Sequence, residues 1–212
     1  MINSPSLQKI GAALSNPPSL QKTGAVCGFA VPVAAFGSIG AAIVSYPEFS
    51  WTNNALSDLG VVPGITAIFF NLGLVIAGLL CFFFAAAGFL SYFKNSAAGK
   101  IGAIVFAAAA VWLAAIGIFN KNIWAIHFAV AVLFFVTLPI ALWVLTAALY
   151  LRREMKLVVF TLVFSFVAAA PWLLYFIVRY APNIAIPEII SGFVGAIWIV
   201  VISFKMLKTE RS

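Results

Sequence analysis

The fold class is decided by residues 64–90, which read GITAIFFNLGLVIAGLLCFFFAAAGFL and contain no charged side chain. A helix needs about twenty mostly apolar residues to cross roughly 30 Å of hydrocarbon. This stretch is long enough, and its apolar positions are continuous, whereas a strand of a membrane barrel alternates apolar with polar residues. Residues 64–90 therefore predict a transmembrane helix.

Five further stretches have the same character. The six predicted spans are residues 24–46, 64–90, 101–119, 125–149, 157–178 and 187–207. The chain is 65% hydrophobic and 8% charged, whereas soluble domains carry about a quarter charged residues. Lipid must act as its solvent, and only helices and closed barrels satisfy their backbone there. We predict an all-α polytopic membrane protein, a six-helix transmembrane bundle with polar tails at residues 1–23 and 208–212.

The basic residues predict how this bundle is oriented. Of the 12 lysine and arginine residues, ten fall in the two tails and in the second and fourth loops. The remaining two, Lys121 and Arg179, fall in the third and fifth loops. Because basic loops stay in the cytoplasm, both termini are expected there, in a plasma membrane. The same division excludes nucleic acid as a partner, since short separated segments form no continuous basic stripe, and leaves membrane lipids as the expected partner.

The first loop, residues 46–60, is a polar and aromatic island between two apolar spans. It reads YPEFSWTNNALSDLG and contains two carboxylates but no lysine or arginine. Asparagine, serine and aspartate are also common turn and capping residues, so residues 55–59 are equally consistent with one capped helical turn. The sequence leaves a functional and a structural interpretation of this loop open.

The outer loops bring together a mixed set of polar residues. A carboxylate that orients an imidazole is the minimum acid–base pair, so Asp58 and His127 are the candidate catalytic residues. The candidate ligand-binding residues, which would hold a polar or phosphorylated headgroup, are Asn54, Asn71, Glu188, Arg179, Lys121 and Trp51.

Several of these residues also have ordinary structural interpretations. His127 is at least as consistent with a hydrogen-bonded histidine at the membrane interface. Glu188 follows a proline at a helix start, where a carboxylate suits the helix dipole. Trp51 is typical of the aromatic belt, and Arg179 ends a span from which it can extend to the headgroups.

Three features of the sequence limit the chemistry. The chain has one histidine and two cysteines without paired spacing, so no metal site is predicted. No nucleotide-binding or hydrolase motif occurs, and no cofactor is predicted. No ionisable residue lies near the middle of a predicted span, which argues against an ion-coupled transporter.

The loop also resembles a known family. Three stretches of it carry the resemblance, namely Tyr46-Pro47, Phe49 to Thr52, and Asn54 to Gly60. They are similar to the hallmark of a prokaryotic membrane family catalogued as domain of unknown function 998. The resemblance continues in order through Asn71 to Leu74, Gly99 to Gly102, Gly117 to Phe119, His127-Phe128 and Leu133 to Phe135. It implies the six-helix fold and an important first loop, and it supplies no activity. A more remote resemblance, carried by few residues, is to eukaryotic membrane proteins that assist lipid remodelling of glycosylphosphatidylinositol anchors.

Two functional hypotheses follow from the sequence. In the first, the 46–60 loop covers an outward-facing pocket in which the protein binds or modifies a lipid or isoprenoid headgroup. In the second, the protein is a non-catalytic accessory subunit, and the same loop docks on other membrane protein subunits. Whether the protein is an enzyme is left open by the residues.

Overall fold

The six predicted spans are helices in the computed structural model, which describes residues 19–210. The chain forms α2 (Leu20–Val44), η1 (Leu56–Val61), α3 (Ile65–Phe83), η2 (Phe84–Phe89), α4 (Leu90–Tyr92), α5 (Ala97–Ile118), η3 (Lys121–Ile123), α6 (Trp124–Leu151), α7 (Met155–Val178) and α8 (Ala185–Glu210). There is no strand within residues 19–210. The all-α, multi-pass fold predicted from the apolar runs is confirmed.

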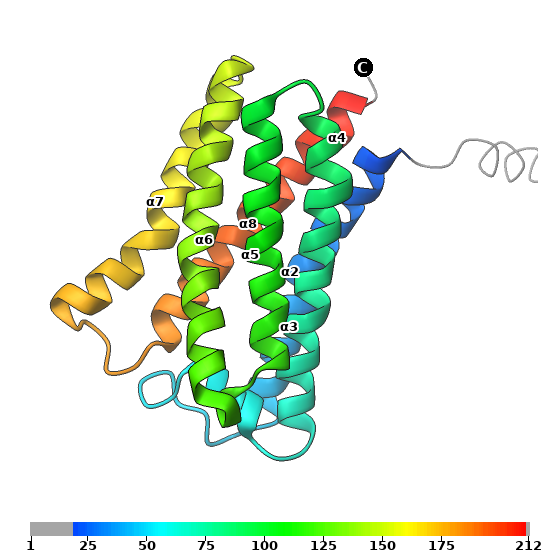
Figure 1. The fold of residues 1–212 in the computed structure, drawn as a ribbon. Coiled ribbons are helices and arrows are strands. Elements are labelled where there is room, and N and C mark those ends of the chain that lie inside the picture. Colours follow the sequence, from blue (N-terminus) through cyan, green and yellow to red (C-terminus); the bar gives the residue numbers. More distant parts are fainter. Residues whose placement is uncertain (1–18, 211–212) are drawn as a thin grey trace, which may run out of the picture.

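The helices form a closed ring in which each packs against its neighbours in the chain and α8 returns to α2 (Figure 1). Elements α3, η2 and α4 are continuous and together make the second span, Ile65–Tyr92. The first span begins at Leu20, four residues before the predicted start, with Ser19 as its N-cap. The predicted tail therefore contributes its last turn to α2, while residues 1–18 lie outside the described part of the chain.

The centre of the ring is filled by aromatic side chains. Phe89 lies 5.6 Å from Phe106 and 5.6 Å from Trp198 between ring centroids, so helices two, three and six of the ring meet at this cluster. Phe84 and Phe89 are both fully or almost fully buried because η2 is a π-helical turn that rotates the chain between them. This packing joins the three helices at a buried aromatic cluster.

Small residues allow the helices to approach closely. A Cβ on Gly24 of α2 would overlap the backbone of Gly88 in η2. In the same way, a Cβ on Gly117 of α5 would overlap the carbonyl of Asn71 in α3. At these two contacts, the absence of a side chain permits the close approach of neighbouring helices.

The bundle has two distinct ends. Figure 1 places the start of α2 and the end of α8 at one end, which we call the terminal end, together with the turns at 93–96 and 152–154. The opposite end, the loop end, contains residues 45–64, 119–123 and 179–184. Because the number of spans is even, the start of the first span and the end of the last one lie at the same end. The cytoplasmic location of the terminal end stays a prediction.

Candidate functional site

The first loop folds back over the loop end of the bundle. Asn54 Oδ1 accepts a hydrogen bond from the backbone N–H of Ser50 at 2.9 Å, and Asp58 Oδ2 accepts one from the N–H of Ala55 at 2.8 Å. These bonds close the turn that starts η1, while Leu56 and Leu59 are buried beneath it. The capped turn, one of the two interpretations left open for residues 55–59, is present as the 3₁₀ helix η1.

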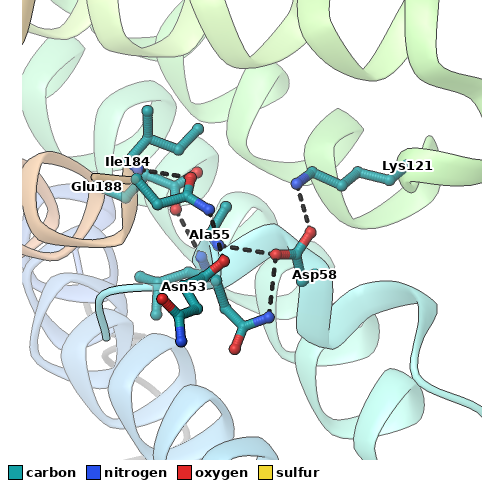
Figure 2. Close-up of polar contacts among 9 residues, drawn as sticks. Asn53, Ala55, Asp58, Lys121, Ile184 and Glu188 are labelled. Carbon is teal, nitrogen blue, oxygen red and sulfur yellow. Dashed lines mark hydrogen bonds and ion pairs between the residues drawn. The ribbon is translucent and has the colours of Figure 1, made fainter. Parts of the chain in front are cut away.

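Side chains from three other segments hold this loop in place (Figure 2). Lys121 of η3 forms an ion pair with Asp58. Glu188 of α8 accepts a hydrogen bond through Oε2 from the Leu56 N–H at 2.7 Å. Asn183 Nδ2, from the segment before α8, donates to the Asn53 carbonyl at 2.9 Å. Beneath the loop, Asn71 Nδ2 of α3 donates to the Gly60 carbonyl at 2.8 Å. The loop is therefore a fixed cover on the bundle.

Asp58 is ionised in this arrangement. Its partial burial by itself raises the pKa of the carboxyl group, but the hydrogen bonds from Lys121 and from the Ala55 N–H favour the charged form. The second effect wins, and the pKa of Asp58 lies below its ordinary value. Asp58 consequently serves as an anionic anchor for Lys121 at neutral pH.

A lateral groove of about 680 Å³ opens between α6 and α7 near the loop end. In Figure 1, α7 diverges from α6 toward this end of the bundle. The walls are apolar and aromatic, and include Phe128, Phe135, Trp143, Trp172 and Phe176. Polar side chains also line the groove: Ser57, Lys121, His127, Tyr175, Arg179 and Glu188. Sites for small ligands commonly measure about 300–1,000 Å³, with mostly apolar walls and a few polar groups.

A second cavity of about 110 Å³ lies inside the ring. Its walls are almost wholly apolar, with residues from α2, α3, α5, α6 and α8. Five residues line both this cavity and the lateral groove: Ser57, His127, Ala131, Phe135 and Glu188. The three polar ones, Ser57, His127 and Glu188, we call the polar junction.

His127 has a defined tautomer at the polar junction. Its side chain is buried, and Nδ1 lies 2.8 Å from the carbonyl oxygen of Phe119. Because a carbonyl oxygen only accepts, Nδ1 carries the hydrogen, and Nε2 of the neutral ring holds a free lone pair. Nε2 has no hydrogen-bond partner within residues 19–210. The ring is therefore oriented by the backbone and offers a proton acceptor.

Ser57 has a buried hydroxyl group without a partner. The residue is 4% exposed, and its Oγ makes no hydrogen bond within the described chain. Other hydroxyls of the helices donate to a backbone carbonyl: Ser38 to Ala35, Ser165 to Leu162, and Ser191 to Ala168. Buried hydroxyl groups nearly always have a partner, so the free Ser57 hydroxyl requires an explanation.

The predicted site residues divide into two groups. Lys121, Arg179 and His127 line the groove, as does Glu188. Asp58, Asn54, Asn71 and Trp51 line neither cavity. Asn54 and Asn71 make contacts within or beneath the loop, and Asp58 bonds both to the loop backbone and to Lys121 of η3. Trp51 is 44% exposed and packs edge-on against Phe49 at 5.2 Å.

The predicted Asp58–His127 pair has no hydrogen bond within residues 19–210, since Asp58 bonds to Lys121 and His127 to Phe119. Their catalytic roles stay a prediction. Ser57 was not among the predicted site residues, because a serine beside Asn and Asp in a loop is typical of turns. Glu188 does begin a helix, yet its carboxylate bonds to Leu56 of the loop.

The pattern of a family of proteins of unknown function, DUF998, matches residues 29–205, which include η1, both cavities and the polar junction. The chain belongs to the DUF998 family. No curated protein and no solved structure matches it. DUF998 membership agrees with the resemblance of the first loop; a prokaryotic source and the remote likeness to anchor-remodelling proteins stay predictions.

Proposed function

We propose that the protein binds a membrane lipid in the groove between α6 and α7, with the lipid headgroup under the 46–60 loop. The observation that carries this proposal is the distribution of side chains in the groove. Apolar and aromatic residues line most of its 680 Å³, and the ionisable ones lie in the loop-end segments or in the helix turns next to them. An amphiphile, with a chain at one end and a polar group at the other, matches that division.

The charges of the groove favour an anionic headgroup. Arg179 is exposed and makes no ion pair within residues 19–210; its guanidinium group lies 5.9 Å from the Tyr175 ring. Lys121 has three N–H donors, one of which bonds to Asp58. Arginine and lysine together are typical phosphate-binding groups, so a phospholipid or an isoprenoid phosphate is the proposed ligand class.

The loop end is proposed to face outward from a plasma membrane. This orientation rests on the ten basic residues of the opposite side. Thr52 is exposed in the loop, so an impermeant maleimide should label Thr52→Cys in intact cells. Labelling only after the cells are opened would reverse the proposed orientation.

Native mass spectrometry of the protein released gently from its membrane tests lipid binding. We expect a retained lipid in the wild type and its loss in Ala169→Trp, because Ala169 lines the groove on α7. Leu133→Trp is the matched control, since Leu133 is a lipid-facing residue that lines neither cavity. Retention that is equal in both variants would contradict the proposal.

The accessory-subunit hypothesis is favoured by one observation, the exposed Trp51 at the tip of an otherwise anchored loop. Tryptophan is enriched among the residues that dominate protein interfaces. The same preparation tests this alternative. A stoichiometric protein partner that is lost in Trp51→Ala, with no retained lipid, would make the loop a docking surface.

A further inference from the structure

We propose that Ser57 is a nucleophile that accepts an acyl group from an ester-linked lipid, with His127 as its general base. This inference rests on the proposed lipid-binding function and names its chemistry. The geometry points to the polar junction as the reacting centre, because this is where the lateral groove and the inner cavity meet.

The backbone around Ser57 is fixed on both sides. The preceding residue, Leu56, donates its N–H to Glu188 at 2.7 Å, and the following residue, Asp58, is paired with Lys121. Ser57 is therefore held between two anchors while its own hydroxyl is left free. A preorganised backbone suits a nucleophile. Ser57 Oγ and His127 Nε2 make no hydrogen bond with each other in this structure, and such bonds between nucleophile and base commonly tighten when the substrate binds.

One other buried hydroxyl in the described chain lacks a partner, and a comparison with it shows what distinguishes Ser57. Ser203 Oγ of α8 is fully buried and unbonded, but Ser203 lines neither cavity. Ser57 instead lines both cavities, together with an imidazole. Among the hydroxyl groups of residues 19–210 that are buried without a partner, only that of Ser57 belongs to a residue that lines these cavities.

The imidazole of His127 is prepared to accept a proton. Its Nδ1–H donates to the Phe119 carbonyl at 2.8 Å, so Nε2 is the nitrogen that can accept a proton. His127 lines both cavities. In a serine–histidine pair, a backbone or carboxylate acceptor on Nδ1 keeps the ring in this tautomer. Phe119 supplies that acceptor here.

The surroundings favour a carboxylic ester over a phosphate ester as the reacting group. Glu188 shares the polar junction with Ser57 and His127, so an anionic phosphoryl group there would meet a carboxyl group and no cation. The two cationic residues, Lys121 and Arg179, line the lateral groove but not the inner cavity, so neither is part of the polar junction. A neutral ester carbonyl therefore suits the junction, with apolar volume beyond it for the acyl chain.

The reaction balances with water as the second substrate. Ser57 Oγ attacks the ester carbonyl carbon while His127 Nε2 takes the Oγ proton; the carbon–oxygen bond to the alcohol then breaks, and His127 returns the proton to that oxygen. Water next attacks the acyl-serine ester, releasing a fatty acid and restoring Ser57 and His127. Glu188 is a positioning residue, since it acts on Ser57 through the Leu56 N–H.

An alkyl fluorophosphonate is the probe that tests this inference on the full-length protein in its detergent-solubilised form. Attack by Ser57 would form an oxygen–phosphorus bond and release fluoride, leaving an adduct that peptide mass spectrometry assigns to one residue. We expect labelling at Ser57 in the wild type, none in Ser57→Ala, and a rate lower by about 10²–10⁴-fold in His127→Ala, the usual contribution of a general base.

Ser203→Ala is the matched control, because it removes the other unpartnered buried hydroxyl and should leave labelling unchanged. Retained lipid is measured in the same samples. A wild type that retains lipid but takes no label at Ser57 would overturn the inference and leave lipid binding intact. A wild type that retains no lipid would instead overturn the proposed function. Equal labelling rates in the wild type and His127→Ala would remove His127 as the base.

Discussion

The carboxylate of Glu188 in α8 accepts a hydrogen bond at 2.7 Å from the backbone N–H of Leu56, which lies 132 positions earlier in the chain. This bond joins the last span to the first loop across the loop end of the bundle. It also explains why a carboxyl group lies at an otherwise apolar helix start: one of its oxygens accepts from the backbone of the loop. It is one of the contacts that hold η1 in place, with the Lys121–Asp58 ion pair and the Asn71–Gly60 hydrogen bond.

Replacing Glu188 should release the start of η1. Glu188→Ala leaves the buried Leu56 N–H without its acceptor, and we expect a loss of about 1–3 kcal/mol in the free energy of unfolding, the usual cost of an unsatisfied buried donor. Amide hydrogen exchange at Leu56 should accelerate. Glu188→Gln is the control, because its amide oxygen can still accept the bond. Exchange that is equally slow in both variants would show that other contacts hold the loop.

The Asp58–Lys121 ion pair should stabilise the loop weakly at neutral pH. Their side chains are 30% and 20% exposed, and ion pairs open to solvent contribute about 0.2–1 kcal/mol. A double-mutant cycle of Asp58→Asn and Lys121→Met, read by thermal unfolding, should give a coupling energy in that range. Additive effects of the two substitutions would show that the pair contributes nothing.

The pH dependence of that coupling has a definite sign. The pKa of Asp58 is lower in the folded protein than its ordinary value. Its stabilisation is therefore fully present above the ordinary carboxyl range and is lost as the pH falls through the lowered pKa. The coupling energy from the cycle should persist at pH 5 and vanish in stronger acid.

The terminal end has a denser charge network around Glu154. Its carboxylate accepts from Tyr92 Oη at 2.8 Å and Arg152 Nε at 2.9 Å, and it pairs with Lys205 Nζ at 2.9 Å. Burial alone raises the pKa of Glu154, but these three donors outweigh it and lower the pKa below the ordinary value. The network joins the second span, the turn before α7, and α8.

Glu154→Gln should therefore lower the melting temperature at neutral pH. We expect a cost of about 1–3 kcal/mol from weakened charged hydrogen bonds. The difference from the wild type should shrink in acid, because stability from a lowered carboxyl pKa is lost as the pH falls through that pKa. A difference that is constant from pH 7 to strong acid would assign the effect to packing.

The sequence predicts the six spans well because each apolar run is long enough to require lipid on its own. It also predicts that His127, Glu188, Lys121 and Arg179 lie at one end, since an odd-numbered loop or span start carries each of them. It does not predict that Asp58 pairs with Lys121, because that choice depends on how η1 meets η3. Local patterns contain no information about such tertiary contacts.

The groove and the free hydroxyl of Ser57 are likewise properties of packing. The groove lies where α7 diverges from α6, and helix inclination is set by neighbouring helices rather than by the length of an apolar run (Figure 1). In the sequence Ser57 resembles any turn serine, because the absence of a partner for its hydroxyl is a property of the tertiary structure. The π-helical turn at Phe84–Phe89 is a third such feature, since no glycine–proline pair or charge marks it.

Substitution of Arg179 tests two effects, the cost of its left-handed backbone conformation and its role in binding a lipid headgroup. It ends α7 in the left-handed conformation, with φ of 50°, which costs a residue with a side chain roughly 1–2 kcal/mol relative to glycine. Arg179→Gly should therefore raise the free energy of unfolding by about 1 kcal/mol while it weakens retention of an anionic lipid. Arg153, with φ of 58° at the terminal end, is the matched control: Arg153→Gly should give the same gain in stability and leave lipid retention unchanged. Stability by thermal unfolding and lipid retention by native mass spectrometry are measured on both variants. Equal lipid retention in the two would exclude Arg179 from the headgroup site, because only Arg179 lines the groove.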